Sequence, residues 1–418
     1  MKTRQISMQF PACLKNLWIC KVRRLSLPVL CMLTFGVAAF AQRVTITTID
    51  APGAGTAGGY GTEGIVINPA GEVAGFYAGY SNAMHGYLRT RDGKIVTFDA
   101  PGAASSGVGI PFPTVGTSQG TYAVGIDASG AITGYTIDAF NVGHSYVRET
   151  DGKFTMFDVP GAGVGNGQGT FAGSMSLAGA INGNYIDARG VWHAFLRATD
   201  GVIAEFDAPG AGKSSGQGTF GGWAQCINTA GTIVGYSVDE KGVNHGFIRT
   251  HNGVITVFDA PGAGTGSGQG TLTWAINATG TIAGTFVDAK NVYHGLLRTA
   301  DGKLTVFDVS AAGKGAGQGT QGMGIDSEGV VTGYYTDAKG VAHGFLRAAD
   351  GKFTFFDVSG AGTASGQGTF PMTNIPGQTT GYYVDSIGVF HGFVMTDSPC
   401  ACGSQTGIAV LSGSFPPA

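Results

Sequence analysis

Histidine and aspartate residues recur along this chain at a constant spacing, and they are the first candidates for chemistry. Seven of the eight histidines occur in variants of a His-Gly-Phe-Leu-Arg motif, and in six copies an Asp lies six residues before the His. A second Asp ends a Phe-Asp motif on the neighbouring strand of the same unit. The complete sets are Asp138, His144 and Asp158; Asp187, His193 and Asp207; Asp239, His245 and Asp259; Asp288, His294 and Asp308; Asp337, His343 and Asp357; and Asp385 and His391 with Asp50 from the other end of the chain. The first copy keeps only His85 and Asp99, because Gly79 replaces its first Asp.

Two kinds of chemistry suit these rows. In the structural interpretation, an imidazole between two carboxylates donates from both ring nitrogens, and an Asp at a strand end accepts backbone N–H groups of the following turn. In the alternative, each row holds a divalent cation, with calcium as the candidate ion and no other cofactor expected. Repetition in nearly every unit favours the structural interpretation, because catalysis normally requires one asymmetric pocket.

A glycine-rich loop is the second candidate for binding. It reads Pro-Gly-Ala-Gly-x-x-x-Gly-Gln-Gly-Thr, and Tyr60 takes the place of its Gln in the first unit. The glutamines of the other units are Gln119, Gln168, Gln217, Gln269, Gln318 and Gln367. Exposed backbone amides, Gln and nearby aromatic residues could hydrogen-bond to and stack on sugars, although glycine there could simply allow a tight crossover. No phosphate-loop Lys follows these glycines, so a nucleotide site is not expected.

Residues that break the repeat are few. No Gly-x-Ser-x-Gly elbow, His-Glu-x-x-His motif or zinc-type cysteine pairing is present. Glu63 stands where other units have Tyr122, Phe171, Phe220 or Phe370. The tryptophans at 192, 223 and 274 occupy different places in their units. An enzyme would need such unique residues, from the insertion at 107–117 or the region of Trp223 and Cys226, and no convincing catalytic set is found.

The elements that must position these residues are short strands. Each unit has four strand-like runs, such as 254–258, 271–276, 281–287 and 294–298, and Asp-Gly or Asn-Gly joins each His-Gly-Phe run to the next Phe-Asp run. Four strands in every ~40–50 residues are typical of a β-propeller. We therefore predict an all-β, seven-bladed β-propeller of four-stranded blades over residues 42–397, rather than a β-solenoid. The repeats lie near 44–93, 94–152, 153–201, 202–253, 254–302, 303–351 and 352–397.

The two ends of the repeat region complement each other. The first Phe-Asp-like strand, 44–50, has no preceding His-Gly-Phe strand, and the strand from His391 has no following partner. Pairing them completes the seventh blade and removes an open sheet edge. In such a blade, the turn before each His and the long glycine-rich loop lie on one face. That face would therefore carry both the Asp-His-Asp rows and the glutamine loops.

Residues 1–41 are expected to be a secretory signal peptide, and residues 398–418 a flexible tail. A basic start is followed by an apolar run from Leu25 and a small-x-small site at Ala39-Phe40-Ala41. Six of the 24 basic residues and none of the 27 acidic ones lie in this segment, which leaves a formal net charge of −9. That charge argues against nucleic acid and anionic membrane surfaces as partners. We expect a secreted, periplasmic or envelope protein with no membrane insertion after cleavage.

The string Trp192-His193-Ala194-Phe195-Leu196-Arg197 resembles the HAF-type extracellular bacterial repeat. Gly125-Ile126-Asp127 is one of the turns that accompany it, and the resemblance covers nearly all of residues 44–396. Most copies here read His-Gly-Phe rather than His-Ala-Phe. The resemblance implies an exported protein and identifies a repeat type, not an activity.

These observations favour a non-enzymatic, exported binding or scaffold protein. Near-identical blades suit multivalent recognition, and polysaccharide on the loop face is the preferred ligand, with another extracellular protein as the other partner class. The alternatives are an extracellular lyase or hydrolase acting in the central channel or on the loop face, and a structural component of the envelope or matrix.

Overall fold

The computed structural model describes residues 43–107 and 118–398, and the regular elements in these ranges are β-strands. The predicted signal peptide and all but Gly107 of the insertion at 107–117 lie outside the described residues. Strand β28 (Phe390–Ser398) extends one residue into the predicted tail, whose remainder also lies outside. No helix in the described ranges is long and apolar enough to cross a membrane.

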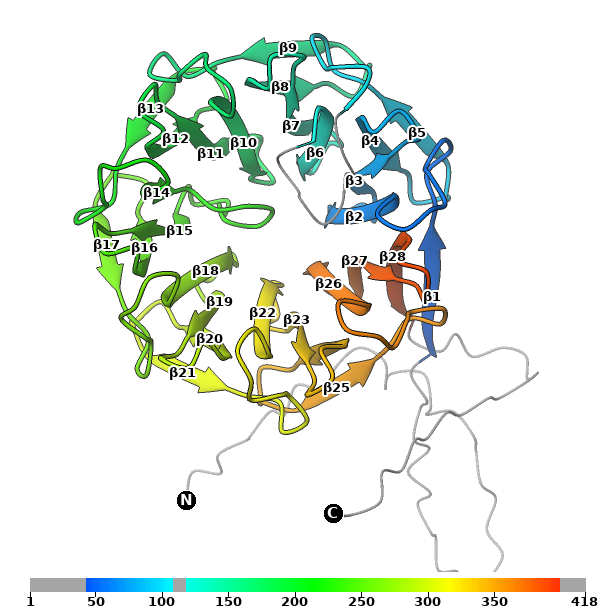
Figure 1. Cartoon of the computed structure of the whole chain (residues 1–418), viewed down its shortest axis with the longest axis vertical. Helices are drawn as coiled ribbons and strands as arrows, with labels where there is room; N and C mark the ends of the chain where they lie inside the picture. The colour runs from blue at the N-terminus through cyan, green and yellow to red at the C-terminus, as the bar shows by residue number, and fades with distance from the viewer. Residues whose placement is uncertain (1–42, 108–117, 399–418) are drawn as a thin grey trace, which may run out of the picture. The chain divides into compact units, whose positions relative to one another are not determined.

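The strands form an all-β, closed and repeating arrangement, as predicted (Figure 1). Twenty-eight strands fit seven groups of four, and within each group neighbouring strands pair antiparallel. We number the groups along the chain: group 1 is β2–β5, group 2 is β6–β9, group 3 is β10–β13, group 4 is β14–β17, group 5 is β18–β21, group 6 is β22–β25, and group 7 is β26–β28 with β1.

Each group runs from the centre of the ring to its rim (Figure 1). The inner strands are β2 (Gly61–Ile67), β6 (Gly120–Ile126), β10 (Gly169–Met175), β14 (Gly218–Phe220), β18 (Gly270–Ile276), β22 (Gly319–Ile325) and β26 (Gly368–Ile375). The second strands are β3 (Val73–Ala78), β7 (Ile132–Ile137), β11 (Ile181–Ile186), β15 (Ile233–Val238), β19 (Ile282–Val287), β23 (Val331–Thr336) and β27 (Gln378–Val384). The third strands are β4 (Met84–Arg89), β8 (Gly143–Arg148), β12 (Trp192–Arg197), β16 (Asn244–Arg249), β20 (Tyr293–Arg298), β24 (Ala342–Arg347) and β28. The outer strands are β5 (Ile95–Phe98), β9 (Phe154–Phe157), β13 (Ile203–Phe206), β17 (Ile255–Phe258), β21 (Leu304–Phe307), β25 (Phe353–Phe356) and β1 (Arg43–Ile49).

The two ends of the repeat region close the ring. Strand β1 pairs antiparallel with β28 over its whole length, from Arg43 opposite Ser398 to Ile49 opposite Gly392. The side chain of Ile49 is buried there, with only 1% of its surface exposed. The predicted pairing of the first strand with the last is therefore confirmed.

The motif residues connect each group to its neighbour. The glycine that opens each inner strand pairs with the start of the preceding group's third strand, as Gly218 does with Trp192. Gly218 has φ of 120°, and a Cβ there would lie 2.0 Å from the Trp192 carbonyl oxygen, so a side chain cannot fit. The next residue, Thr219, is fully buried, and its hydroxyl accepts the Ala208 N–H at 2.9 Å. These contacts explain the recurring Gly-Gln-Gly-Thr sequence.

Arginine and phenylalanine of the two main motifs also meet between groups. Arg148 at the end of β8 lies over the ring of Phe98 in the preceding group, 4.8 Å from its centroid. The same cation–π contact recurs for Arg197, Arg249, Arg298 and Arg347, at 4.8–5.0 Å. Such contacts contribute about 0.5–2 kcal/mol each, depending on desolvation.

The fourth group departs from the repeat. Its inner strand β14 has only three residues, and the following residues 221–228, which we call the central loop, extend into the centre of the ring (Figure 1). The loop turns at Gly222 and at Ala224, which has φ of 62°. Gln225 reaches across the ring, donating from Nε2 to the Asn374 carbonyl at 2.9 Å and accepting the Ile325 N–H at 3.3 Å. The sequence predicted the same four strands in every group, and it therefore did not predict this loop.

Candidate functional site

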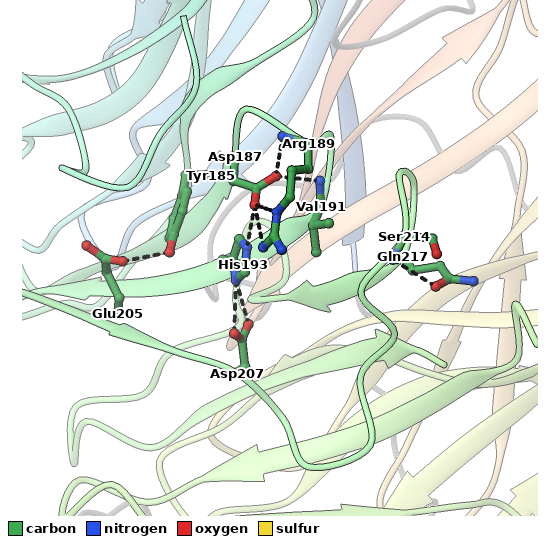
Figure 2. Close-up of polar contacts among 9 residues, drawn as sticks. All are labelled: Tyr185, Asp187, Arg189, Val191, His193, Glu205, Asp207, Ser214 and Gln217. Atoms are coloured by element: carbon green, nitrogen blue, oxygen red, sulfur yellow. Dashed lines mark hydrogen bonds and ion pairs between the residues drawn. The ribbon is translucent and has the colours of Figure 1, made fainter. Parts of the chain in front are cut away.

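The structure brings each predicted His and Asp together at the ends of three strands. In all seven rows the Nδ1 atom of the His lies 2.7–3.0 Å from the outer Asp. In the six rows with a first Asp, Nε2 lies 3.5–3.8 Å from its carboxylate. Figure 2 shows one row, in which His193 stands between Asp187 and Asp207.

The first Asp of each row organises the turn beside it. Asp187 accepts the backbone N–H groups of Arg189 at 2.8 Å and Val191 at 2.9 Å on one oxygen, while the other oxygen faces His193 (Figure 2). The His193 ring stacks on Tyr185, with centroids 4.8 Å apart. Burial opposes ionisation of Asp187, but the N–H donors and the Arg189 guanidinium outweigh it and lower its pKa to about 2.

The rows therefore hold turns and strand ends in place. Hydrogen bonds to Asp357 and Asp50 raise the pKa values of His343 and His391, against the opposing effect of burial. No group of three or more His, Cys, Asp or Glu side chains within 43–107 and 118–398 has the geometry to hold a metal ion. Calcium binding by the rows stays a prediction.

The predicted binding glutamines link their own loops to the neighbouring turn between the second and third strands. The side-chain oxygen of Gln217 accepts the Ser214 N–H at 3.1 Å, and its Nε2 donates to the Glu240 carbonyl at 3.1 Å. Gln318 makes the equivalent pair of contacts with Gly315 and Ala338. Loop and turn also bond directly, as from Gly216 N–H to the Gly190 carbonyl. We therefore assign the glutamines to loop closure on this face, which we call the loop face.

An aromatic pocket of about 490 Å³ lies on the loop face and spans groups 2 to 5. Its aromatic lining is Tyr135, Phe171, Trp192, Phe220, Trp223, Tyr236 and Trp274. Neighbouring rings touch in sequence around it. Trp192 stacks on Phe220 at 4.7 Å between centroids, and Phe220 stacks on Tyr236 at 4.8 Å. Tyr236 then meets Trp274 edge-on at 5.8 Å.

The sequence singled out Trp192, Trp223 and Trp274 only as irregular, and the structure brings all three to this pocket. Trp192 begins β12, Trp223 lies in the central loop, and Trp274 lies in β18. The three tryptophans come from non-equivalent positions in groups 3, 4 and 5. They meet because the central loop carries Trp223 into the space between the other two groups. The one signal in the sequence was that these tryptophans break the repeat in three consecutive units.

The central loop forms part of the pocket and is fixed by Cys226. The fully buried sulfur lies 3.1 and 3.0 Å from the carbonyl oxygens of Trp223 and Trp274, either of which can accept its one proton. Burial raises the pKa of Cys226 to about 12, so the thiol is not an ionised nucleophile at neutral pH. Asn184, which also lines the pocket, accepts the Gly221 N–H. Cys226 is thus a positioning residue for two tryptophans.

A second cavity of about 460 Å³ lies at the opposite ends of the inner strands. Ala224 and Gln225 line this cavity, whereas Gly222 and Trp223 line the aromatic pocket. The central loop therefore stands between the two cavities, and the aromatic pocket opens on the loop face.

Glu63 is a buried carboxyl group in the inner strand β2, at a position that is aromatic in several other groups. Its side chain is 3% exposed, and no hydrogen bond or ion pair of the described residues involves its carboxyl group. Burial raises the pKa of Glu63 to about 8, so the group is largely protonated at neutral pH. Its charged form would in turn raise the pKa values of Tyr135 and Tyr382, for which burial is the larger cause.

No protein-family model and no curated protein sequence matches this chain. Among solved structures, the BP39L lectin from Burkholderia pseudomallei is similar with a TM-score of 0.51 at 10% identity, over 81% of this chain and 97% of the lectin. AofleA from Arthrobotrys oligospora has a TM-score of 0.41 at 13% identity, over 76% of this chain and 90% of its own. A puromycin hydrolase has a TM-score of 0.42 at 11% identity, over 82% and 52%. Of these structures, the BP39L lectin alone has a TM-score above 0.5, and at 10% identity this similarity shows a shared propeller-like fold and nothing more.

Proposed function

We propose that this chain is a seven-bladed β-propeller of four-stranded blades, one for each group, that binds carbohydrate in the aromatic pocket of its loop face. We also propose that it is exported and non-enzymatic, which agrees with the pattern of residues 1–41 and with the HAF-type resemblance. The pocket is the observation that carries the proposal, because it is the place where non-equivalent residues converge on one concave site.

The chemistry of the lining suits a sugar ring. Phe220 lies between Trp192 and Tyr236, so the rings left for a ligand are those of the three tryptophans. Their faces carry the negative side of the aromatic quadrupole, which attracts the polarised C–H groups on the flat face of a pyranose. The amides of Asn141 and Asn184 supply polar contacts for hydroxyl groups. A volume of about 490 Å³ falls within the range of small-ligand sites.

The proposal places recognition in one pocket rather than in seven equivalent loops. The glutamine amides that the sequence suggested as repeated contacts bond to their own loop and to the neighbouring turn, as Gln217 and Gln318 do. The pocket, in contrast, needs the shortened β14 and the central loop, which occur once in the described chain. The BP39L lectin shares the fold, and its name agrees with a sugar-binding role for this scaffold.

The test is binding of the protein to a glycan array, followed by titration calorimetry, with calcium and then with a chelator. We expect saturable binding that Trp192→Leu weakens by roughly tenfold, since loss of one stacked aromatic contact costs about 1.5 kcal/mol. Phe355→Leu is the matched control, because Phe355 is 53% exposed on the outer strand β25. Binding that survives Trp192→Leu and Trp274→Leu unchanged would reject the pocket as the site. Loss of binding with chelator would assign metal to the Asp-His-Asp rows.

A further inference from the structure

A polar groove continues outward from the aromatic pocket. A third cavity, of about 370 Å³, shares Gly167, Ile186 and Trp192 with the aromatic pocket, so these two spaces are contiguous. This third cavity, which we call the outer groove, is otherwise lined by polar and small residues. Its polar side chains are Asn166, Gln168, Arg189 and Ser215. A ligand longer than one sugar ring would extend from the pocket into this groove.

Arg189 is the one charged side chain among the described residues that line the pocket or the groove. It lies at the tip of the turn between β11 and β12, and 70% of its side chain is exposed. Both Nε and Nη2 lie 2.8 Å from Asp187 Oδ2, which fixes one edge of the guanidinium (Figure 2). No contact within the described residues uses Nη1, so the outer edge, Nη1 with Nη2, remains open to a ligand carboxylate.

Basic residues continue from Arg189 along the same face. Lys241, Lys290 and Lys339 occupy the equivalent turn position in groups 4, 5 and 6, which follow group 3 around the ring (Figure 1). All three are exposed, and none forms an ion pair with the described residues. In groups 1, 2 and 7 the same position holds Ser81, Phe140 and Ile387. The cations therefore occupy one continuous arc.

Acidic groups on this arc are already engaged. The first Asp of each row accepts backbone N–H groups and faces a His, as Asp239 does with Lys241 N–H, Val243 N–H and His245. The outer Asp of each row is bound to the Nδ1 atom of that His. Glu240 is the one acidic residue at the two tip positions of the seven turns. The carboxylates of the rows thus each face a His, whereas the three lysine ammonium groups have no ion-pair partner among the described residues.

We infer that the ligand is an acidic polysaccharide built from uronic acids, an inference that rests on the proposed carbohydrate function. One sugar ring occupies the aromatic pocket, and the carboxylate of the next residue binds the open edge of Arg189 in the outer groove. A guanidinium edge matches a carboxylate with two parallel hydrogen bonds, which an ammonium group cannot reproduce. Further carboxylates follow the lysines of groups 4 to 6.

The test compares a defined oligogalacturonate with the same oligosaccharide after reduction of its carboxylates to alcohols. We expect calorimetry at low salt to show at least roughly tenfold tighter binding of the acidic form. Arg189→Gln should lower affinity for the acidic form far more than for the reduced form and so remove most of this preference, whereas Arg189→Lys should keep part of it. Replacing Lys241, Lys290 and Lys339 with Gln should lessen the salt dependence of the acidic ligand's affinity.

The controls separate this inference from the proposed function. Lys94 and Lys303 lie in the Asp-Gly hairpins on the opposite face, so their change to Gln should alter neither affinity. Equal affinity for the two ligands, or a preference that survives Arg189→Gln, would overturn the acidic class while leaving sugar binding intact. Absence of binding by either form and by every glycan of the array would reject the carbohydrate function itself.

Discussion

The buried carboxyl group of Glu63 should make the stability of this protein depend on pH. Its folded-state pKa of about 8 lies above the ordinary value of 4.5, so the folded chain holds a proton that the unfolded chain releases in this range. Unfolding therefore becomes more favourable as the pH rises from about 4.5 to 8, and the effect is complete above pH 8. A difference of about 3.5 pH units at 1.36 kcal/mol per unit corresponds to a loss of about 5 kcal/mol.

Glu63→Gln tests this reasoning because the amide has a similar shape and does not titrate. Urea unfolding of both proteins between pH 4.5 and 8.5 gives the difference in their free energies of unfolding, in which the other titrating groups cancel. We expect the two proteins to be similar at pH 4.5 and the variant to be more stable by about 3 kcal/mol at pH 7. Glu149→Gln, at an exposed hairpin residue, is the control. A difference that stays constant across this range would refute the assignment of Glu63 as a buried, protonated acid.

Three further results follow from the contacts between groups. Deletion of residues 43–49 should lower the midpoint of thermal unfolding by at least about 10 °C, because β28 loses its outer partner and keeps only β27. An unchanged midpoint would contradict closure of the ring. Gly218→Ala should lower the free energy of unfolding in urea by more than about 3 kcal/mol. Gly216→Ala is the control: no atom lies within 4 Å of its new Cβ, so only the positive φ should cost stability, by about 1 kcal/mol. Equal losses in the two variants would reject the close approach at Gly218. Since Asp50 raises the pKa of His391, its stabilisation is fully present below pH ~6.5 and is lost as the pH rises through the folded pKa. His391→Gln should therefore cost more stability at pH 5.5 than at pH 8.5, and a cost that is equal at the two pH values would contradict this pairing.

Much of the architecture was predictable because each motif residue has one steric or electrostatic task. The glycine opening each inner strand cannot carry a side chain, the following Thr binds a backbone N–H, and the Asp and His pair at strand ends. Such requirements recur with every unit, so the period, the four strands and the pairing of the two ends could be inferred from spacing alone.

The aromatic pocket could not be inferred from the repeat, because it depends on the one group that departs from it. Ala224 adopts a positive φ that its residue type does not signal, and residues 221–228 keep only isolated bridges in place of a continuous inner strand. Only then do Trp192, Trp223 and Trp274 meet. The role of the glutamines was also hidden, because a sequence pattern does not show whether an amide faces a ligand or its own loop.

Intrinsic fluorescence tests the central claim most directly. The chain from Gln42 onward contains three tryptophans, Trp192, Trp223 and Trp274, and all three line the aromatic pocket. Titration with the oligosaccharide that binds in calorimetry should change the tryptophan emission with saturation at the same Kd. Binding that is visible by calorimetry and leaves the emission spectrum unchanged would place the carbohydrate elsewhere and contradict the pocket as the functional site.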